Sequence, residues 1–344
     1  MTKEAVLSIP LPRLMDLKID YAFKQLFGTE KNKDITVLFL NAVLKRTGRN
    51  TIQDITFHNT EVGGEYFEDK QSRLDLLVVT QADEWINVEI QFTNQFDMVK
   101  RSLYYWSKVY ASPLEKGQGY SALKPVIAVN ILNFNLLPKT DLFHTTYHLM
   151  EDEEKTKLTD VMEIHFIKIP KLLRDWKKKK LDPWNDLLAR WLLLLGMVDH
   201  RNKKIKVYED IYKELEGIAM KDEPLQEAFS IWQQLSLSKE HYLAYEGRLR
   251  RIQDEAAAIA EAKQREEEAA ARALETGLQK GLQKGLEQGL EQGLEQGLQQ
   301  GFEQGQSIIV QHLFAQKFTV EEIVKLTGLS EEYVMNIQKQ SDKK

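Results

Sequence analysis

The sequence predicts an α/β fold in which helices flank a mixed sheet, followed by a helical extension and a C-terminal helical tail that carries a glycine repeat. Three successive sequence patterns along the chain lead to this prediction. Up to about residue 170, short apolar runs alternate with segments whose apolar residues have helical spacing. Up to about residue 250, leucine and aromatic residues recur at helical spacing. Beyond that point, strong helix formers lead into a strict four-residue repeat.

Residues 1–170 are expected to form the first domain, because strand-like and helix-like segments mix there. The nearly continuous apolar run "KPVIAVNILNF" is typical of a strand buried on both faces. Strands are expected within 51–62, 72–94 (two strands and a turn), 124–134, 145–150 and 163–169, and helices over 20–28, 33–46 (with a stop at Gly48) and 95–114 (with Pro113 near its end).

Composition narrows the class of protein. The chain has no cysteine, which excludes a disulfide framework and thiolate chemistry and fits a reducing compartment. The longest apolar run, "WLLLLGMV", is too short to span a bilayer, and the N-terminus lacks the pattern of a secretory signal. We therefore expect a cytoplasmic protein without a membrane span. The net charge of −5 does not indicate nucleic-acid binding by the whole chain, so such binding would use local patches.

Three further segments are expected after residue 170: a helical extension over 171–250, a charged helix with the repeat over 251–306, and a small helix-turn-helix-like unit over 307–344. In the last unit, Gly328 suits the turn and Ser330 suits the cap of the next helix. Because acidic residues follow that cap, we interpret the unit first as an interaction or dimerisation unit and second as a DNA reader.

Glycine recurs at every fourth position from Gly277 to Gly305, each followed by leucine or phenylalanine. A helical glycine costs about 1 kcal/mol relative to alanine, so its smallness has to be used, for instance by a second backbone that comes close. A period of four drifts about 40° per repeat on a helix, which requires a right-handed supercoil with a partner. We expect a homo-oligomer through this region, with a low-complexity spacer as the alternative.

The stretch "SRLDLLVVTQADEWINVEIQFTN" (72–94) predicts a hairpin that buries one face. Leu74, Leu76 and Val78 share one face of the first strand, and alternate residues from Ile86 to Phe92 share one face of the second. Polar side chains fall on the opposite face of both strands, and these are Asp75, Glu89 and Gln91.

If Val79 pairs with Trp85, Asp75 lies opposite Glu89 with Cβ atoms about 5 Å apart. Two carboxylates at that distance repel, unless one is protonated or a cation bridges them. A divalent ion, Mg²⁺ or Mn²⁺, bound by Asp75 and Glu89 resolves the conflict and would polarise a phosphoryl oxygen. Gln91 would orient a water molecule or a phosphate oxygen, since an amide cannot act as a general base. The alternative is a half-exposed sheet whose polar residues are solvated.

These motifs resemble a known family. "RLDLLV" followed by "VEIQ", preceded by "DYAFKQLFG" and followed by "KRSLYYWSKVY", resembles the PD-(D/E)XK nucleases, specifically the branch of recombination-promoting nucleases and transposases. The resemblance covers about residues 15–135 and extends to the glycine-repeat tail. It implies a restriction-endonuclease-like fold, Mg²⁺ bound by Asp75 and Glu89, and a site completed by Gln91. Lysine is usual at that last position, which puts a lysine-assisted mechanism in doubt.

Residues on the neighbouring helices are expected to support the site. Asp20 and Lys24 are four residues apart, so Lys24 would contact a phosphate of DNA and Asp20 would add an acidic group; a plain surface ion pair is the alternative. Arg101 and Tyr105 have the same spacing, and the guanidinium of Arg101 would bind a DNA phosphate. For Tyr105, packing on an ordinary helix face is slightly favoured.

The resemblance implies a Mg²⁺-dependent DNA endonuclease that promotes recombination or acts as a toxic nuclease in phage defence. The expected partners are DNA, further copies of the chain through the tail, and an inhibitory protein that binds the tail. The alternative from another class is a non-catalytic DNA- or protein-binding module on a nuclease fold. The two hypotheses differ in whether Asp75 and Glu89 bind a divalent ion.

Overall fold

The computed structural model describes residues 10–58, 61–62, 72–93, 97–114, 118–201 and 205–341. The chain divides into two compact units, Met1–Ile259 and Ala260–Lys344. The first unit holds an α/β structure and the second is helical. This confirms the predicted α/β class with a long helical region at its C-terminal end.

A six-stranded mixed sheet forms the centre of the first unit. Its strand order is β1 (Ile55–Phe57), β4 (Leu76–Thr80), β5 (Trp85–Gln91), β6 (Val126–Leu132), β8 (Met162–Lys168) and β7 (His144–Tyr147). The central strands β5, β6 and β8 run parallel, whereas β1, β4 and β7 pair antiparallel with their neighbours. Two small sheets pair β2 (Glu61–Val62) with β3 (Ser72–Arg73) and β9 (Val198–Asp199) with β10 (Lys206–Val207).

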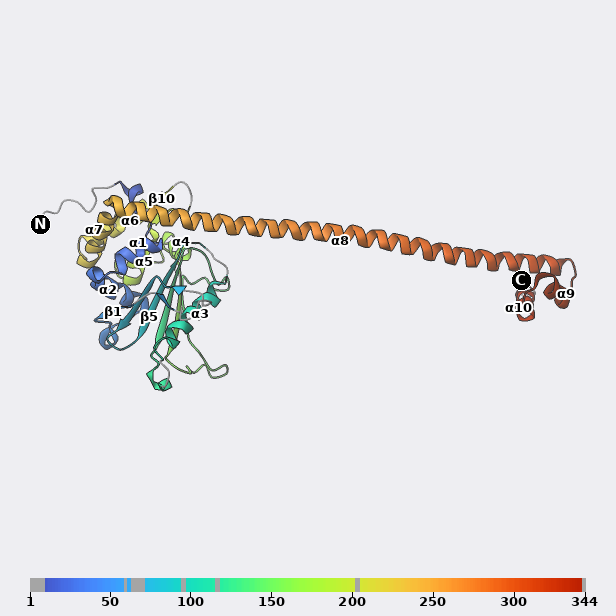
Figure 1. Cartoon of the computed structure of the whole chain (residues 1–344), viewed down its shortest axis with the longest axis horizontal. Helices are drawn as coiled ribbons and strands as arrows, with labels where there is room; N and C mark the ends of the chain where they lie inside the picture. The colour runs from blue at the N-terminus through green and yellow to red at the C-terminus, as the bar shows by residue number, and fades with distance from the viewer. Residues whose placement is uncertain are drawn as a thin grey trace. The chain divides into compact units, whose positions relative to one another are not determined.

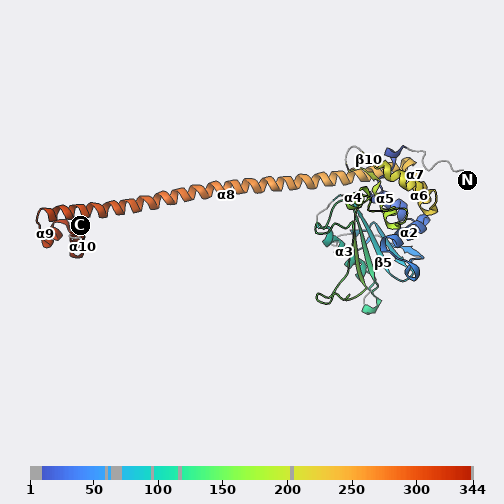
Figure 2. The same ribbon diagram turned by 180° about the vertical axis from the view of Figure 1, so that it is seen from behind.

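Helices cover both faces of the main sheet (Figures 1 and 2). One face packs against α1 (Asp20–Phe27), α2 (Lys33–Leu44) and α5 (Leu187–Gly196), and α3 (Met98–Ala111) lies on the other. The remaining helices of this unit are α4 (Ile169–Lys177), α6 (Glu209–Ala219), α7 (Glu223–Leu237), the start of α8 (Lys239–Ala315), and the 3-10 turns η1 (Leu11–Arg13), η2 (Glu30–Asn32), η3 (Gly48–Asn50) and η4 (Tyr120–Ala122).

One hydrophobic core joins the sheet to the helices that follow it in sequence. Phe23 and Val88 belong to the same buried cluster as Trp232, Tyr245 and Ile252. The run "LLARWLLLLG" makes this possible, because every residue of α5 except its first is buried. The core therefore reaches into the first turns of α8, and these turns are fixed against the sheet-bearing part of the chain.

The second unit contains most of α8, which is continuous through the glycine repeat, followed by α9 (Val320–Thr327) and α10 (Glu331–Ser341). Val310, Ile323, Val334 and Ile337 form a small core of their own. Gly328 has a φ of +71° and makes the predicted turn between α9 and α10. None of the helices in the described ranges is long and apolar enough to cross a membrane.

Two local expectations about the first unit are wrong. Helix α2 ends at Leu44, where Lys45 adopts a left-handed conformation (φ 53°), so the helix stops before Gly48. Leu74 packs with Leu77 rather than with Leu76, because the chain bends at Asp75 and the alternation of the strand starts only after it. The predicted strand over 51–62 is interrupted, and its residues 59–60 lie outside the described ranges. So do residues 94–96, where the hairpin prediction ends and the predicted helix begins.

Candidate active site

The β4–β5 hairpin brings two carboxylates together at one end of the sheet. Its register pairs Leu76 with Val88, and one further step sets Asp75 opposite Glu89. The backbone N–H of Asp75 donates a hydrogen bond to Oε1 of Glu89 at 3.2 Å. The N–H of Ile90 donates to Oδ2 of Asp75 at 3.0 Å. The predicted pairing of Val79 with Trp85 is also present, so the loop length fixed the register correctly.

Helix α1 adds a cation to this pair. Lys24 Nζ lies 3.2 Å from Oδ1 of Asp75, so α1 borders the carboxylates as the sequence suggested. The alternative of a plain surface ion pair between Asp20 and Lys24 is not found among the interactions of the described residues. Instead, both carboxylate oxygens of Asp20 accept hydrogen bonds from Nε of Arg248, at 2.7 and 2.8 Å.

Helix α3 and the end of β5 supply the other side of the site. Arg101 Nη2 lies 3.8 Å from Oε2 of Glu89, and its guanidinium carbon lies 5.1 Å from the centre of the Tyr105 ring. Gln91 Nε2 donates a long hydrogen bond of 3.4 Å to the same oxygen of Glu89. Tyr105 packs against the buried cluster that includes Leu77, which agrees with a packing role.

Burial and mutual repulsion disfavour the charged forms of both carboxyl groups. Burial raises the pKa of Glu89 well above its usual value, the charge of Asp75 raises it further, and Arg101 opposes this. Burial also raises the pKa of Asp75, against the pull of Lys24 and with a further contribution from Asp20. The physical causes are loss of hydration and a like charge nearby. Two carboxyl groups thus sit where an additional cation would be stabilising.

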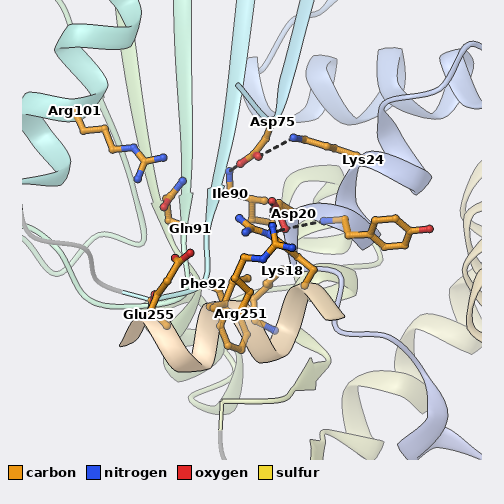
Figure 3. Close-up of a pocket in the computed structure, with 14 residues that line it drawn as sticks. Lys18, Asp20, Lys24, Asp75, Ile90, Gln91, Phe92, Arg101, Arg251 and Glu255 are labelled. Carbon is orange, nitrogen blue, oxygen red and sulfur yellow. Dashed lines mark hydrogen bonds and ion pairs between the residues drawn. The ribbon is translucent and has the colours of Figure 1, made fainter. Parts of the chain in front are cut away.

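A cleft of about 450 Å³ is lined by Asp75 and by Gln91 and Arg101, which contact the buried Glu89. In Figure 3, Arg101 and Gln91 lie on one side, Asp75 and Lys24 on another, and the first turns of α8 carry Arg251 and Glu255 along a third. Lys18 and Asp20 also line the cleft. The cleft thus combines carboxylates with several cations, which is the chemistry that a phosphate ester and a divalent ion require together.

The donor set fits a magnesium ion. Magnesium is usually held by one or two carboxylates, with water and substrate phosphates completing its shell. Asp75 and Glu89 supply such a pair, and burial raises both of their pKa values despite the nearby Lys24 and Arg101, so a further cation bound by the pair would stabilise the charged carboxylates. Within the described residues, no group of three or more histidine, cysteine, aspartate or glutamate side chains is arranged to hold a metal. Asp20 would have to leave Arg248 in order to contribute a third carboxylate.

A sequence model described as "PD-(D/E)XK nuclease family transposase" matches residues 17–262, more than two thirds of the chain. The chain belongs to the PD-(D/E)XK nuclease family transposases. Searches of curated proteins and of solved structures returned no match. Family membership implies a nuclease-like action on DNA, and it bears out the resemblance inferred from the hairpin motifs and the flanking helices. Nucleases of this family typically use a divalent metal ion.

The sequence reasoning missed the part of α8 that lines the cleft. Arg248, Arg251 and Glu255 lie in the segment "YLAYEGRLRRIQDE", which had been interpreted only as part of a helix. The sequence did contain a signal that this segment packs against the core, because Tyr245 and Ile252 are seven residues apart and lie on one helix face. The contact of this segment with the hairpin could not be predicted, because about 150 residues separate the two in sequence.

Proposed function

We propose that the protein is a divalent-metal-dependent DNA endonuclease that hydrolyses phosphodiester bonds in the cleft around Asp75 and Glu89. The observation that carries the proposal is the juxtaposition of these two buried carboxyl groups, both with raised pKa values, of which Asp75 lines a cleft rich in cations. Burying two facing carboxyl groups is costly for a fold. Such an arrangement is expected where a bound cation offsets the cost.

In this proposal Asp75 and Glu89 hold Mg²⁺ or Mn²⁺, which when bound supplies charge stabilisation at the phosphoryl oxygen and lowers the pKa of water. Lys24 approaches the site from α1, and Arg101 approaches it from α3. Both side chains would move from the carboxylates to the phosphate oxygens of the DNA, since a guanidinium or ammonium pairs with either anion. Gln91 would hold a water molecule or a phosphate oxygen through its amide.

The structure supports a restriction-endonuclease-like description of the core, because the catalytic pair would lie on adjacent strands of a mixed sheet that helices flank. We propose, as the sequence led us to expect, that the protein acts in the cytoplasm. Its proposed role is to promote recombination or to serve as a toxic nuclease in phage defence. The alternative function, a non-catalytic DNA- or protein-binding module, keeps the cleft but does not require the metal.

The test uses purified protein with supercoiled plasmid and Mg²⁺. We expect nicking that EDTA abolishes, that Mn²⁺ restores, and that Asp75→Ala and Glu89→Ala each abolish. Glu84→Ala is the matched control, because Glu84 lies at the other end of the same hairpin, where it pairs with Arg46 at 2.9 Å. Undiminished nicking by either site variant would contradict the proposed site. DNA binding by the wild-type protein without any metal-dependent cleavage would favour the non-catalytic module.

We further propose that the repeat within α8 associates with the same helix of a second copy. The leucines of the repeat, from Leu278 to Leu298, are 65–71% exposed, so they are unpartnered in the single chain. Apart from the adjacent residues and the backbone of the helix itself, no atom of the described residues lies within 4 Å of the place that a Cβ would take on any glycine from Gly277 to Gly305. The strict spacing presents the glycines and the leucines as two adjacent stripes, about 100° apart, that rotate slowly together along the helix, and an identical helix could match them. The α9–α10 unit is proposed as an interaction unit, and an inhibitory protein is a candidate partner of the tail.

A further inference from the structure

The first turns of α8 form one wall of the candidate active site. Arg248, Arg251, Ile252 and Glu255 line the same cleft as Asp75. These four residues follow one another at intervals of three, one and three, which spans little more than two helical turns. The cleft is therefore built from α1, the hairpin, α3 and a helix that begins only at residue 239.

This part of α8 is held firmly in the first unit. Tyr245 is 1% exposed, its hydroxyl accepts a hydrogen bond from the N–H of Asp16 at 3.0 Å, and it lies 2.6 Å from Nδ1 of His200. Ile252 is buried in the main hydrophobic core. Arg248 then joins α8 to α1 through its hydrogen bonds to Asp20. These contacts fix the direction in which the next residues of α8 project.

Arg251 is the residue that these contacts leave available to a ligand. Its side chain is exposed and lines the cleft, and it forms no ion pair with another described residue (Figure 3). Its neighbour Arg250 differs, since it pairs with Glu246 at 3.8 Å and lies outside the cleft lining. The two adjacent arginines therefore have the same charge and are both exposed, but only Arg251 lines the cleft.

The charge of the cleft explains why such a residue is useful. Asp75 and Glu89 would repel the phosphates of an incoming DNA strand. Lys24 and Arg101 offset the two carboxylates, and Arg248 offsets Asp20. Lys18 is paired with Asp16. Of the cleft-lining charges, Arg251 and Glu255 then remain without an ion pair to another described residue, and Arg251 is the positive one. The fork of its guanidinium matches the oxygens of a phosphate.

From this arrangement we infer that Arg251 binds a backbone phosphate of the DNA strand in the cleft, so that α8 contributes directly to substrate binding. The inference rests on the proposed function and adds a residue that neither the family motifs nor the hairpin contain. The family match ends at residue 262, so it includes this part of α8 and excludes the glycine repeat. The cleft wall and the repeat thus fall on opposite sides of the boundary of the family match.

The experiment compares full-length Arg251→Ala with full-length Arg250→Ala. Binding of a fluorescently labelled DNA duplex is followed by anisotropy in Ca²⁺, a hard divalent ion offered in place of Mg²⁺, over a series of NaCl concentrations. A backbone phosphate contact weakens binding uniformly across sequences when it is lost, and lowers the slope of log K against log salt by about 1. We expect this change, with a roughly five- to tenfold loss of affinity at low salt, for Arg251→Ala and not for Arg250→Ala.

Two results would overturn the inference. If Arg251→Ala keeps the wild-type slope, or if both variants lose the same affinity and slope, Arg251 makes no specific phosphate contact. In either case, plasmid nicking by the wild-type protein and its loss in Asp75→Ala would leave the proposed function standing. If the wild-type protein neither binds nor cleaves DNA, the proposed function fails and the inference fails with it. Circular dichroism of each variant verifies that the fold is retained.

Discussion

Replacing Glu89 by glutamine should stabilise the metal-free protein. Glu89 is 1% exposed, faces Asp75, and has a raised pKa because of burial and the charge of Asp75. Glutamine keeps the Oε1 acceptor that receives the N–H of Asp75, and it removes the charge. The Glu89→Gln variant therefore relieves the repulsion, and its cost is limited to the two long contacts of Oε2, the 3.4 Å hydrogen bond from Gln91 and the 3.8 Å ion pair with Arg101.

The size of the effect follows from the geometry of the pair. Facing strand residues have Cβ atoms about 5 Å apart, and two charges at about 5 Å repel by about 3 kcal/mol at an effective dielectric constant of about 20. Arg101, 3.8 Å from Glu89, and Lys24, 3.2 Å from Asp75, offset part of this repulsion. We expect a net gain of about 1–2 kcal/mol, which for a domain of this size corresponds to about 2–8 °C in Tm.

The pH dependence has a defined sign. A carboxyl group whose pKa is raised in the folded state contributes its stability below its unfolded pKa, and this contribution is lost as pH rises through the folded pKa. Wild-type stability should therefore fall relative to that of Glu89→Gln as pH rises above about 4.3. The difference in Tm between the two proteins should be small near pH 4 and largest near neutral pH.

Thermal unfolding in EDTA and in increasing Mg²⁺ measures both effects. Magnesium that binds only the folded protein stabilises it by about 1.4 kcal/mol at ten times its Kd, so Tm of the wild type should rise while Tm of Glu89→Gln stays nearly constant. Glu84→Gln is the control and should show no gain, because it breaks the ion pair with Arg46. A Glu89→Gln variant that is less stable than wild type in EDTA at neutral pH would refute the reasoning.

Three further outcomes are expected. Gln91→Lys should retain part of the metal-dependent nicking and Gln91→Leu should lose most of it, at least tenfold in rate, because leucine offers no hydrogen bond; a fully active leucine variant would show that the amide is not used. Alanine at Gly285, Gly289 and Gly293 in a fragment of residues 260–344 should raise helicity by circular dichroism and weaken association in sedimentation equilibrium, and equal association would argue for a spacer. Burial lowers the pKa of His144 to about 3, so the unfolded state binds the proton first and stability falls as pH drops below about 6.5; the urea midpoint of His144→Gln should change less between pH 7 and pH 5, and an unchanged profile would contradict this.

The hairpin was predictable because its signals are local. Alternation of apolar residues assigned the two faces, and a five-residue loop set Val79 opposite Trp85. The carboxyl pair followed from that register. Leu74 was misplaced because the bend at Asp75 breaks the alternation, and a period-two pattern carries no information about such a bend.

Contacts across long sequence separations could not be predicted from pattern alone. The spacing of Asp20 and Lys24 is equally consistent with an ion pair between them and with two separate partners. In the structure Asp20 pairs with Arg248 and Lys24 pairs with Asp75. Both pairs depend on how α1 packs against the other elements. Arg251 was missed for the same reason, since a basic residue on a long charged helix is most often solvated.

The two cationic side chains beside the carboxyl pair also account for glutamine at position 91, where lysine is usual in the wider superfamily. Lys24 approaches Asp75 from α1 at 3.2 Å, and Arg101 approaches Glu89 from α3 at 3.8 Å. These two cations already flank the carboxyl pair from opposite sides. A lysine at position 91 would add a third cation next to Glu89 and would compete for that carboxylate with the metal ion that we propose. An uncharged amide avoids that competition and still offers a donor and an acceptor to water or phosphate.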